Sequence, residues 1–462
     1  MKRNLIDRLA VWRSNQTRRP LFLCGMRGCG KTFLALDFAK TFYEGALYLN
    51  FEQRSEKRSR FLQLFAEFGR TGRFGKSVLP GYPDRDGAEA FGAETEPADR
   101  NDSTKDFESA AELGDRENME ETEEHGPAAE RAGRDIMEEH GLSTERADES
   151  PLPAQSLAEL LSAVFELPAE YLRNFLIILD EVMAAEELLK FFPDIWKQSI
   201  PFSIMLLSSR ALPESFLSPA YELHRLFPLQ FDEFLCAVGS EWYAEVIKGH
   251  YQTNHKIPGI VHDELLERFE DYLLTGGMPA AVNEYIASES MDNVFELQQG
   301  ILGKILFDIS RYNEEGLALK MRQILAVIPE QLAKPNPKFQ YRMLRRGATC
   351  AMYEPAINQL TADSVLFPCR KLSDNSCFKL FPADVGLYSS IWSGIPEFFE
   401  RTTLFERTEN LKGKAQHSVW RKMTLECYMM QALIARGYQP VFWDSGSRAK
   451  IDFLIKQHGL YI

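Results

Sequence analysis

The feature that most constrains this chain is the segment Gly25–Thr32, whose sequence GMRGCGKT fits the pattern G-x-x-x-x-G-K-[ST]. Before it, Pro20–Cys24 is a compact apolar run of the kind that forms a buried parallel strand. After it, Phe33–Phe42 has apolar residues at helical spacing and is followed by Gly45, which favours a helix end. The motif therefore stands between a predicted strand and a predicted helix, where a loop of this kind can wrap phosphate groups.

Each residue type in this loop has a physical reason to be there. Glycines let backbone N–H groups approach phosphate oxygens without an obstructing Cβ, and the start of the helix adds partial positive charge. Lys31 is expected to reach the β- and γ-phosphates, and the Thr32 hydroxyl is expected to bind Mg²⁺. The predicted phosphate-binding residues are Gly25, Arg27, Gly28, Cys29, Gly30, Lys31, Thr32 and Phe33. The alternative is a glycine-rich turn that binds nothing.

The charge of the chain is unevenly distributed. Its 462 residues carry a formal net charge of −14, but residues 81–150 alone contain 23 acidic and 7 basic residues. The other residues together are close to neutral, so composition leaves nucleic-acid binding open. Residues 72–155 contain too few large apolar side chains to offset the entropy of ordering. We expect a disordered acidic insertion there, and the alternative is a regulatory or partner-binding arm.

The cysteines and the apolar runs indicate in which cellular compartment the protein is expected. The chain has seven cysteines, an odd number, and no C-x-x-C pair, which is typical of free thiols in a reducing cytosol. The N-terminal residues lack the apolar core of a signal peptide, and the longest apolar runs are too short to span a bilayer. We therefore expect a cytoplasmic protein with no membrane partner.

Two consecutive acids follow a second apolar run. Phe175–Leu179 is a predicted buried strand, and Asp180 and Glu181 come directly after it. An enzyme with a phosphate-binding loop needs an Asp at a strand end to hold Mg²⁺, and an adjacent carboxylate can orient or deprotonate water. We therefore predict Thr32 and Asp180 as metal ligands, and Lys31 and Glu181 as catalytic residues.

Strands and helices alternate in the first half of the chain. Strands are predicted at 20–24, 46–51, 175–179 and 202–207, and helices at 4–12, 33–42, 61–68, 156–165 and 185–198. This alternation predicts an α/β fold with a doubly wound parallel sheet, which binds ligands at the carboxyl ends of its strands. Ser209 follows the last of these strands and is expected to contact the γ-phosphate or the water. The alternative for Ser209 is a simple strand-ending turn.

Several motifs together resemble a family of prokaryotic AAA+-type ATPases. The phosphate-binding loop and the two strand ends are joined by segments similar to family signatures, at Leu226–Leu235, Tyr272–Pro279, Ile305–Tyr312, Gln331–Phe339 and Phe381–Leu387. The resemblance implies a P-loop ATPase domain at 1–230 (with the insertion at 72–155), a helical lid at 231–300, a winged-helix-like domain at 301–395 and a truncated PD-(D/E)XK nuclease-like domain at 396–462. It also implies ATP and Mg²⁺ as ligands.

The nuclease-like segment departs from the family pattern. Glu426 matches its helical Glu and Asp452 its strand Asp, but Lys450 stands where the family usually has Glu. The E-x-K strand is expected to begin where the chain ends, at Ile462. Two carboxylates without the third ligand and the lysine make a poor Mg²⁺ site, so nuclease activity is not expected of this chain. A longer natural chain that supplies E-x-K would instead be a nuclease.

The basic residues of the chain are compatible with more than one kind of partner. Arg342, Arg345 and Arg346 predict a basic helix in the winged-helix-like region, which can bind DNA or protein. Arg210 and Arg225 are each candidates for a γ-phosphate contact, with a solvated or paired surface arginine as the alternative. Many AAA+ proteins complete their active site with an arginine from a neighbouring subunit. A homo-oligomer is therefore one of the alternatives for this chain.

Two functional hypotheses follow. The first is an ATP hydrolase that depends on Mg²⁺, holds the phosphates with Lys31 and the loop amides, and is coupled to an unknown partner. The second is a nucleotide-gated switch with slow hydrolysis, in which the winged-helix-like region binds DNA or a protein. Stimulation of turnover by DNA discriminates between them.

Overall fold

The computed structural model describes residues 1–15, 19–71, 154–185, 201–212, 221–288, 290–393, 415–446 and 449–462. The insertion predicted at 72–155 and the helix predicted at 185–198 fall almost entirely outside these ranges. The described residues belong to one of the two units into which the chain divides, formed by Met1–Pro80 and Pro151–Ile462.

A parallel five-stranded sheet forms the N-terminal part, in the order β2-β3-β4-β1-β5. Its strands are β1 (Leu21–Cys24), β2 (Gly45–Asn50), β3 (Phe175–Asp180), β4 (Ser203–Ser208) and β5 (Glu222–Arg225). The first four confirm the strands that the apolar runs predict. Short 3-10 helices at Ala169–Asn174 and Val182–Ala185 lie on either side of β3 in the sequence.

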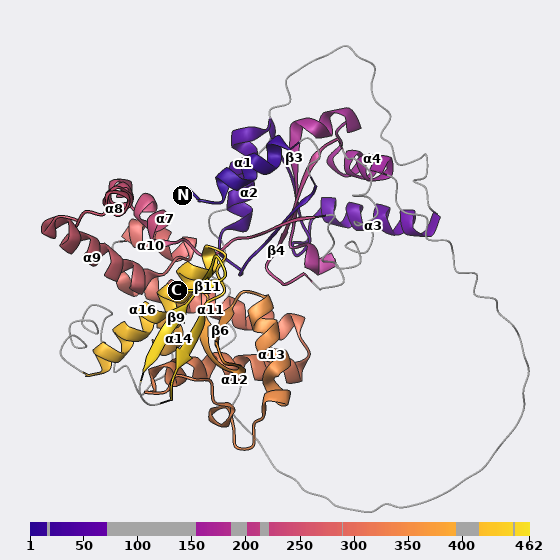
Figure 1. The fold of residues 1–462 in the computed structure, drawn as a ribbon. Coiled ribbons are helices and arrows are strands. Elements are labelled where there is room, and N and C mark those ends of the chain that lie inside the picture. Colours follow the sequence, from indigo (N-terminus) through magenta and orange to yellow (C-terminus); the bar gives the residue numbers. More distant parts are fainter. Residues whose placement is uncertain are drawn as a thin grey trace, which may run out of the picture. The chain divides into compact units, whose positions relative to one another are not determined.

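Alternate residues of the central strands face two different cores. In β3, Leu176 and Ile178 belong to one apolar cluster and Ile177 and Leu179 to the other. The first cluster contains residues of α1 (Ile6–Ser14) and α2 (Lys31–Phe42), and the second contains residues of α3 (Glu56–Thr71) and α4 (Ala154–Phe165). The two helix pairs lie on opposite sides of the sheet (Figure 1), which confirms the doubly wound arrangement.

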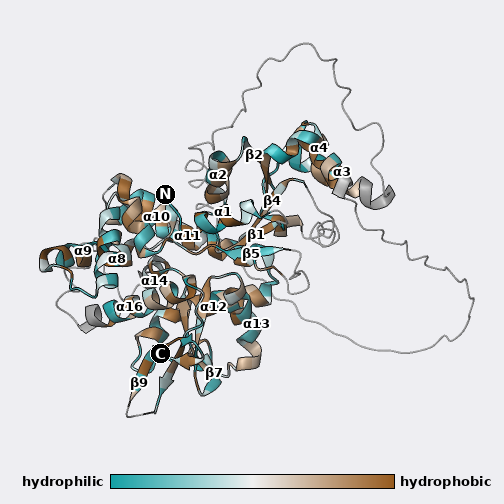
Figure 2. Cartoon of the chain, turned by 45° about the horizontal axis from the view of Figure 1, so that its top comes forward, coloured by the Kyte–Doolittle hydropathy of each residue, from teal (hydrophilic) through white to brown (hydrophobic). Residues whose placement is uncertain are grey.

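The edge strand β5 was not predicted. Its sequence, ELHR, has no apolar run, and it pairs only with β1 among the described strands. Figure 2 shows its hydrophilic character beside the apolar inner strands. Arg225 is the last residue of this strand and is exposed to solvent.

Helices follow the sheet along the chain. They are α7 (Phe231–Ala237), α8 (Glu241–Thr253), α9 (Gly259–Thr275), α10 (Pro279–Ser288), α11 (Met291–Tyr312), α12 (Glu315–Ala333) and α13 (Cys350–Ala362). None of the helices in the described part of the chain has the length and apolar character that crossing a membrane requires. Arg345 and Arg346 lie in a turn after the 3-10 helix Tyr341–Met343, so the prediction of a basic helix there was wrong.

A second sheet, in the order β7-β6-β8-β9, lies in the C-terminal part. It contains β6 (Leu366–Lys371), β7 (Asp374–Pro382), β8 (Val441–Asp444) and β9 (Lys450–Leu454), and a separate hairpin joins β10 (Lys456–Gln457) to β11 (Leu460–Tyr461). Strands β6 and β7 form an antiparallel pair. Because β6 also pairs in parallel with β8, the sheet unites strands from both 301–395 and 396–462. Helices α14 (Val385–Ser393) and α16 (Ala415–Ala435) contact this sheet through β7.

Two of the signature motifs meet around one buried carboxylate. Gly276 ends α9 with φ of +72°, and the N–H of Gly277 donates to Asp384 Oδ2 at 2.7 Å. Asp384 Oδ1 accepts from the backbone N–H of Leu387 at 3.0 Å, at the start of α14. A Cβ on Gly277 would overlap the carbonyl oxygen of Leu229, so only glycine fits between these segments.

Candidate functional site

The phosphate-binding loop joins β1 to α2 as predicted. Its glycines are needed where they stand: Gly28 and Gly30 have φ of +81° and +96°, and a Cβ on Gly25 would overlap the carbonyl oxygen of Leu226. Gly30 is the N-cap of α2 and provides no side-chain cap. The first backbone N–H groups of α2 are therefore available to an anion.

Lys31 is buried at the start of α2, with 5% of its side chain exposed. Its ammonium group donates to the carbonyl oxygens of Gly25 at 3.0 Å and Met26 at 3.3 Å, and to Ser209 Oγ at 2.9 Å. These neutral acceptors hold the cation over the loop without cancelling its charge. The structure thus brings Lys31, which was predicted to reach the phosphates, together with Ser209, which follows β4 and was predicted to contact the γ-phosphate or the water.

Thr32 and Asp180 also meet. The Thr32 hydroxyl donates to Asp180 Oδ2 at 2.7 Å, and Asp180 Oδ1 accepts from the backbone N–H of Glu181 at 2.9 Å. A hydroxyl and a carboxylate are the oxygen ligands that suit Mg²⁺, which usually takes one or two carboxylates and completes its shell with water and substrate phosphates. The residues present therefore fit a Mg²⁺ ion bound together with a nucleotide. Within the described ranges, no three or more His, Cys, Asp or Glu side chains could hold a metal ion by themselves.

Glu181 has the features of a residue that activates water. It is non-glycine but has φ of +50°, a left-handed conformation that costs free energy and is common at functional sites. Its carboxylate accepts hydrogen bonds from the Ser209 hydroxyl and, at 2.9 Å, from the Ser209 backbone N–H. Burial raises the pKa of Glu181, although the Lys31 charge and the Ser209 hydrogen bonds act in the opposite direction.

The other predicted loop residues differ in what their side chains do. Cys29 is fully buried and packs against the Leu226 carbonyl, and burial raises the pKa of its thiol. The Phe33 side chain is 55% exposed on the first turn of α2. Arg27 forms ion pairs with Glu52, at 2.7 Å, and with Asp308. Any phosphate contact of Cys29 or Phe33 would therefore come from the backbone.

The residues that sequence reasoning missed come from segments far away in the chain. Tyr48 and Asn50 of β2 both donate to Asp180 Oδ2, at 2.8 Å and 3.5 Å. Their i, i+2 spacing places them on one face of a strand, but the pairing of β2 with β3 is needed to bring that face to Asp180. Arg3 donates to the Cys29 carbonyl oxygen at 3.0 Å and pairs with Glu233, and no sequence signal points to it.

The segment Gly276–Pro279, with the sequence GGMP, also reaches the phosphate-binding loop. A Cβ on Gly28 would lie 3.0 Å from the Met278 methyl group, and one on Gly30 would lie 3.2 Å from the Pro279 ring. Helix α10 begins at Pro279, the last residue of this segment. The segment therefore has an architectural role and, in addition, covers the glycines of the phosphate-binding loop.

Comparison with known proteins supports the P-loop ATPase character of the N-terminal part. Residues 17–79 match the family described as an AAA domain. Residues 266–397 match a family described as a domain of unknown function, DUF8612. No curated protein matches the chain.

Two solved structures show similarity to the chain. The Walker-type ATPase of Pyrococcus abyssi has 15% sequence identity and a TM-score of 0.42, over 85% of this chain and 95% of that one. A signal transduction ATPase with numerous domains (STAND) from Pyrococcus horikoshii, which has a tetratricopeptide repeat sensor, has 14% identity and a TM-score of 0.28. That match covers 94% of this chain and 48% of the Pyrococcus horikoshii protein.

Proposed function

We propose that this chain is a Mg²⁺-dependent ATP hydrolase. The observation that carries the proposal is the meeting of side chains at three strand ends. Lys31 and Thr32 begin α2 after the loop that follows β1, Asp180 ends β3 and Glu181 comes next, and Ser209 follows β4. The match of residues 17–79 to an AAA domain supports nucleotide binding. ATP rather than GTP follows from the family resemblance, and the sequence contains no N-K-x-D guanine motif.

Each side chain has a distinct role in this proposal. Lys31 and the first N–H groups of α2 bind phosphate oxygens, while Thr32 and Asp180 provide protein ligands for the metal. When bound, Mg²⁺ would neutralise negative charge on the phosphate oxygens. Glu181 orients the attacking water and accepts its proton, and its raised pKa makes it a stronger base. Catalysis then rests on positioning and charge stabilisation, with no covalent step on the protein.

Hydrolysis of ATP by the full chain tests this proposal. Glu181→Gln keeps the shape of the side chain but removes the base, so we expect nucleotide binding to persist while turnover falls by roughly 10²–10⁴-fold. Lys31→Ala removes the buried cation, so we expect binding itself to weaken by about 100-fold or more. Glu170→Gln, which makes the same change at an exposed position, is the matched control. A folded wild type that binds no nucleotide would contradict the proposal.

The second candidate is a nucleotide-gated switch with slow hydrolysis. The observation that favours it is the contact between the phosphate-binding loop and α11, through the ion pair of Arg27 with Asp308. A switch of this kind would bind DNA or a protein through residues 301–395. Turnover that rises sharply when duplex DNA or a partner is added supports the switch, whereas steady turnover without partners supports the simple hydrolase.

A further inference from the structure

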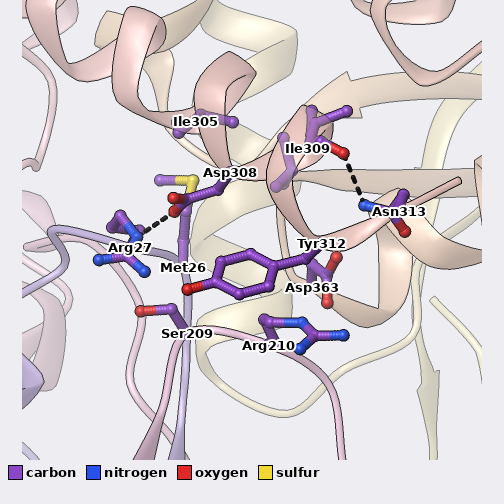
Figure 3. A pocket seen from close by; sticks show the side chains of 11 residues that line it. Met26, Arg27, Ser209, Arg210, Ile305, Asp308, Ile309, Tyr312, Asn313 and Asp363 are labelled. Carbon is purple, nitrogen blue, oxygen red and sulfur yellow. Dashed lines mark hydrogen bonds and ion pairs between the residues drawn. The ribbon is translucent and has the colours of Figure 1, made fainter. Parts of the chain in front are cut away.

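Arg27 is the basic side chain of the phosphate-binding loop that points toward the C-terminal part. Its Nη2 atom donates to both carboxylate oxygens of Glu52, at 2.7 Å and 2.9 Å, and its Nε atom pairs with Asp308 Oδ2. Glu52 follows β2, whereas Asp308 lies on α11, so one guanidinium joins the loop to two other elements. Figure 3 shows Arg27 and Asp308 facing each other at the edge of a pocket that Ser209 also lines.

Tyr312, one turn further along α11, strengthens this contact. Its hydroxyl donates to Glu52 Oε1. Its ring lies against the guanidinium of Arg210, which follows β4, with 4.7 Å between Arg210 Cζ and the ring centroid. These polar and cation–π contacts join helix α11 to Arg27, Glu52 and Arg210 of the nucleotide-binding part. Of these, Arg27 belongs to the segment that would wrap the phosphates.

Arg27, Glu52 and Asp308 form a partly buried cluster of charges. The ion-paired side chains of Arg27, Glu52 and Asp308 are 28%, 14% and 22% exposed, so water screens their interactions only in part. Burial raises the pKa of Asp308, and the nearby Glu52 carboxylate adds to this against the opposing charge of Arg27. The two carboxylates therefore depend on Arg27, because without the guanidinium they would face each other as unpaired like charges.

We propose that Glu52 and Asp308 hold Arg27 as a latch between the phosphate-binding loop and α11, and that bound phosphates compete for Arg27. This inference rests on the proposed function, because it assigns a form of regulation to the same site. Phosphates at the start of α2 attract the guanidinium and repel both carboxylates, so nucleotide binding weakens the attachment of α11. By linkage, a loosened α11 must also strengthen nucleotide binding.

The reciprocal effect gives the first test, which measures the affinity of the full chain for Mg-ATPγS. Asp308→Asn removes one competitor for Arg27, so we expect binding to tighten about fivefold or more. Glu296→Gln, an exposed acid-to-amide change on the same helix, is the matched control and should leave affinity unchanged. Adding Asp308→Asn to Arg27→Gln should give no gain, because the shared cation is then absent. Affinity that is unchanged or weaker in Asp308→Asn overturns the latch.

Amide hydrogen exchange of α11 gives the second test and does not depend on turnover. In the wild type, Mg-ATPγS should speed exchange in residues 303–312, and Arg27→Gln should show fast exchange without nucleotide. Exchange that is unchanged or slower when the wild type binds nucleotide overturns the latch. A wild type that binds no Mg-ATPγS overturns the proposed function as well, whereas a wild type that binds normally with no effect at Asp308 overturns the latch alone.

Discussion

Thr32 and Asp180 lie 148 residues apart in the sequence, yet the Thr32 hydroxyl donates to Asp180 Oδ2 at 2.7 Å. The same carboxylate oxygen accepts from the Tyr48 hydroxyl at 2.8 Å. Tyr48 in turn accepts a hydrogen bond from Asn50 at 3.1 Å. The proposed metal ligand is thus oriented by side chains of the neighbouring strand β2, as ligands in metal sites commonly are.

Tyr48→Phe should weaken the response to Mg²⁺. The change removes the hydroxyl that orients Asp180 but keeps the ring, so we expect the Mg²⁺ concentration for half-maximal ATP hydrolysis to rise by roughly 10–100-fold. Titrating Mg²⁺ at saturating ATP measures this. Tyr43→Phe is a matched control, because the Tyr43 hydroxyl is buried without a hydrogen-bond partner among the described residues. Equal Mg²⁺ requirements in the two variants would show that Tyr48 does not position the ligand.

Ser209→Ala should shift the pH profile of turnover. The Ser209 hydroxyl donates to Glu181 and thereby opposes the effect of burial, which raises the pKa of this carboxyl. Without the hydroxyl the ionised form of Glu181 is less stable, so its pKa rises further and the acidic limb of the kcat profile moves to higher pH, by about one unit.

The control for this shift lies on the same strand. Ser203 begins β4, and its buried hydroxyl has no hydrogen-bond partner within the described part of the chain. Ser203→Ala should therefore leave the profile in place. A profile that stays in place in Ser209→Ala, with only its height reduced, would place Ser209 at the phosphate rather than at the base.

Sequence reasoning succeeded where one local pattern decides the structure. The strands β1, β3 and β4 are buried on both faces, so their apolar runs are visible in the sequence. Because the carboxyl ends of parallel strands share one edge of a sheet, the amino-acid sequence alone predicts that the acids at the end of β3 lie near the phosphate-binding loop. The doubly wound sheet followed from the same patterns.

Prediction from the sequence failed where the pairing of distant segments decides the structure. Glu222–Arg225 becomes a strand only because β1 offers it backbone partners. Tyr48 reaches Asp180 through the register of β2 and β3, in which Asn50 pairs with Asp180. The Arg27–Asp308 ion pair joins two motifs that were predicted separately, and nothing in either motif indicates the other. Tertiary pairings of this kind leave little local signal in a single sequence.

Gly277→Ala should destabilise the chain strongly. The added Cβ would overlap the carbonyl oxygen of Leu229, and this backbone has little room to move because Leu229 N–H donates to the Gly277 carbonyl oxygen at 2.7 Å. We expect a loss of about 3 kcal/mol in the free energy of unfolding, measured by urea denaturation. Gly249→Ala, in the exposed interior of α8 with open space around it, should instead stabilise by about 0.5–1 kcal/mol.

Asp384→Asn should change how stability depends on pH. Complete burial raises the pKa of Asp384 to about 6, against the opposing hydrogen bonds from the backbone N–H groups of Gly277 and Leu387. In the unfolded chain the carboxyl has its ordinary pKa near 3.8. Between about pH 4 and pH 6 the folded chain therefore binds more protons, so this group makes the fold less stable as pH rises through that window. Two pKa units correspond to about 3 kcal/mol.

Comparing the wild type with Asp384→Asn isolates the contribution of Asp384, because the other titrating groups affect the free energy of unfolding equally in both proteins. Tyr272 is close to Asp384, but burial raises its pKa well above the usual value, so it stays neutral throughout the window. From pH 4 to pH 6.5, the wild type should lose about 3 kcal/mol of unfolding free energy relative to Asp384→Asn, measured by urea denaturation at each pH. Parallel curves for the two proteins would mean that Asp384 titrates normally, and that its hydrogen bonds to the glycine segment fully offset the cost of burial.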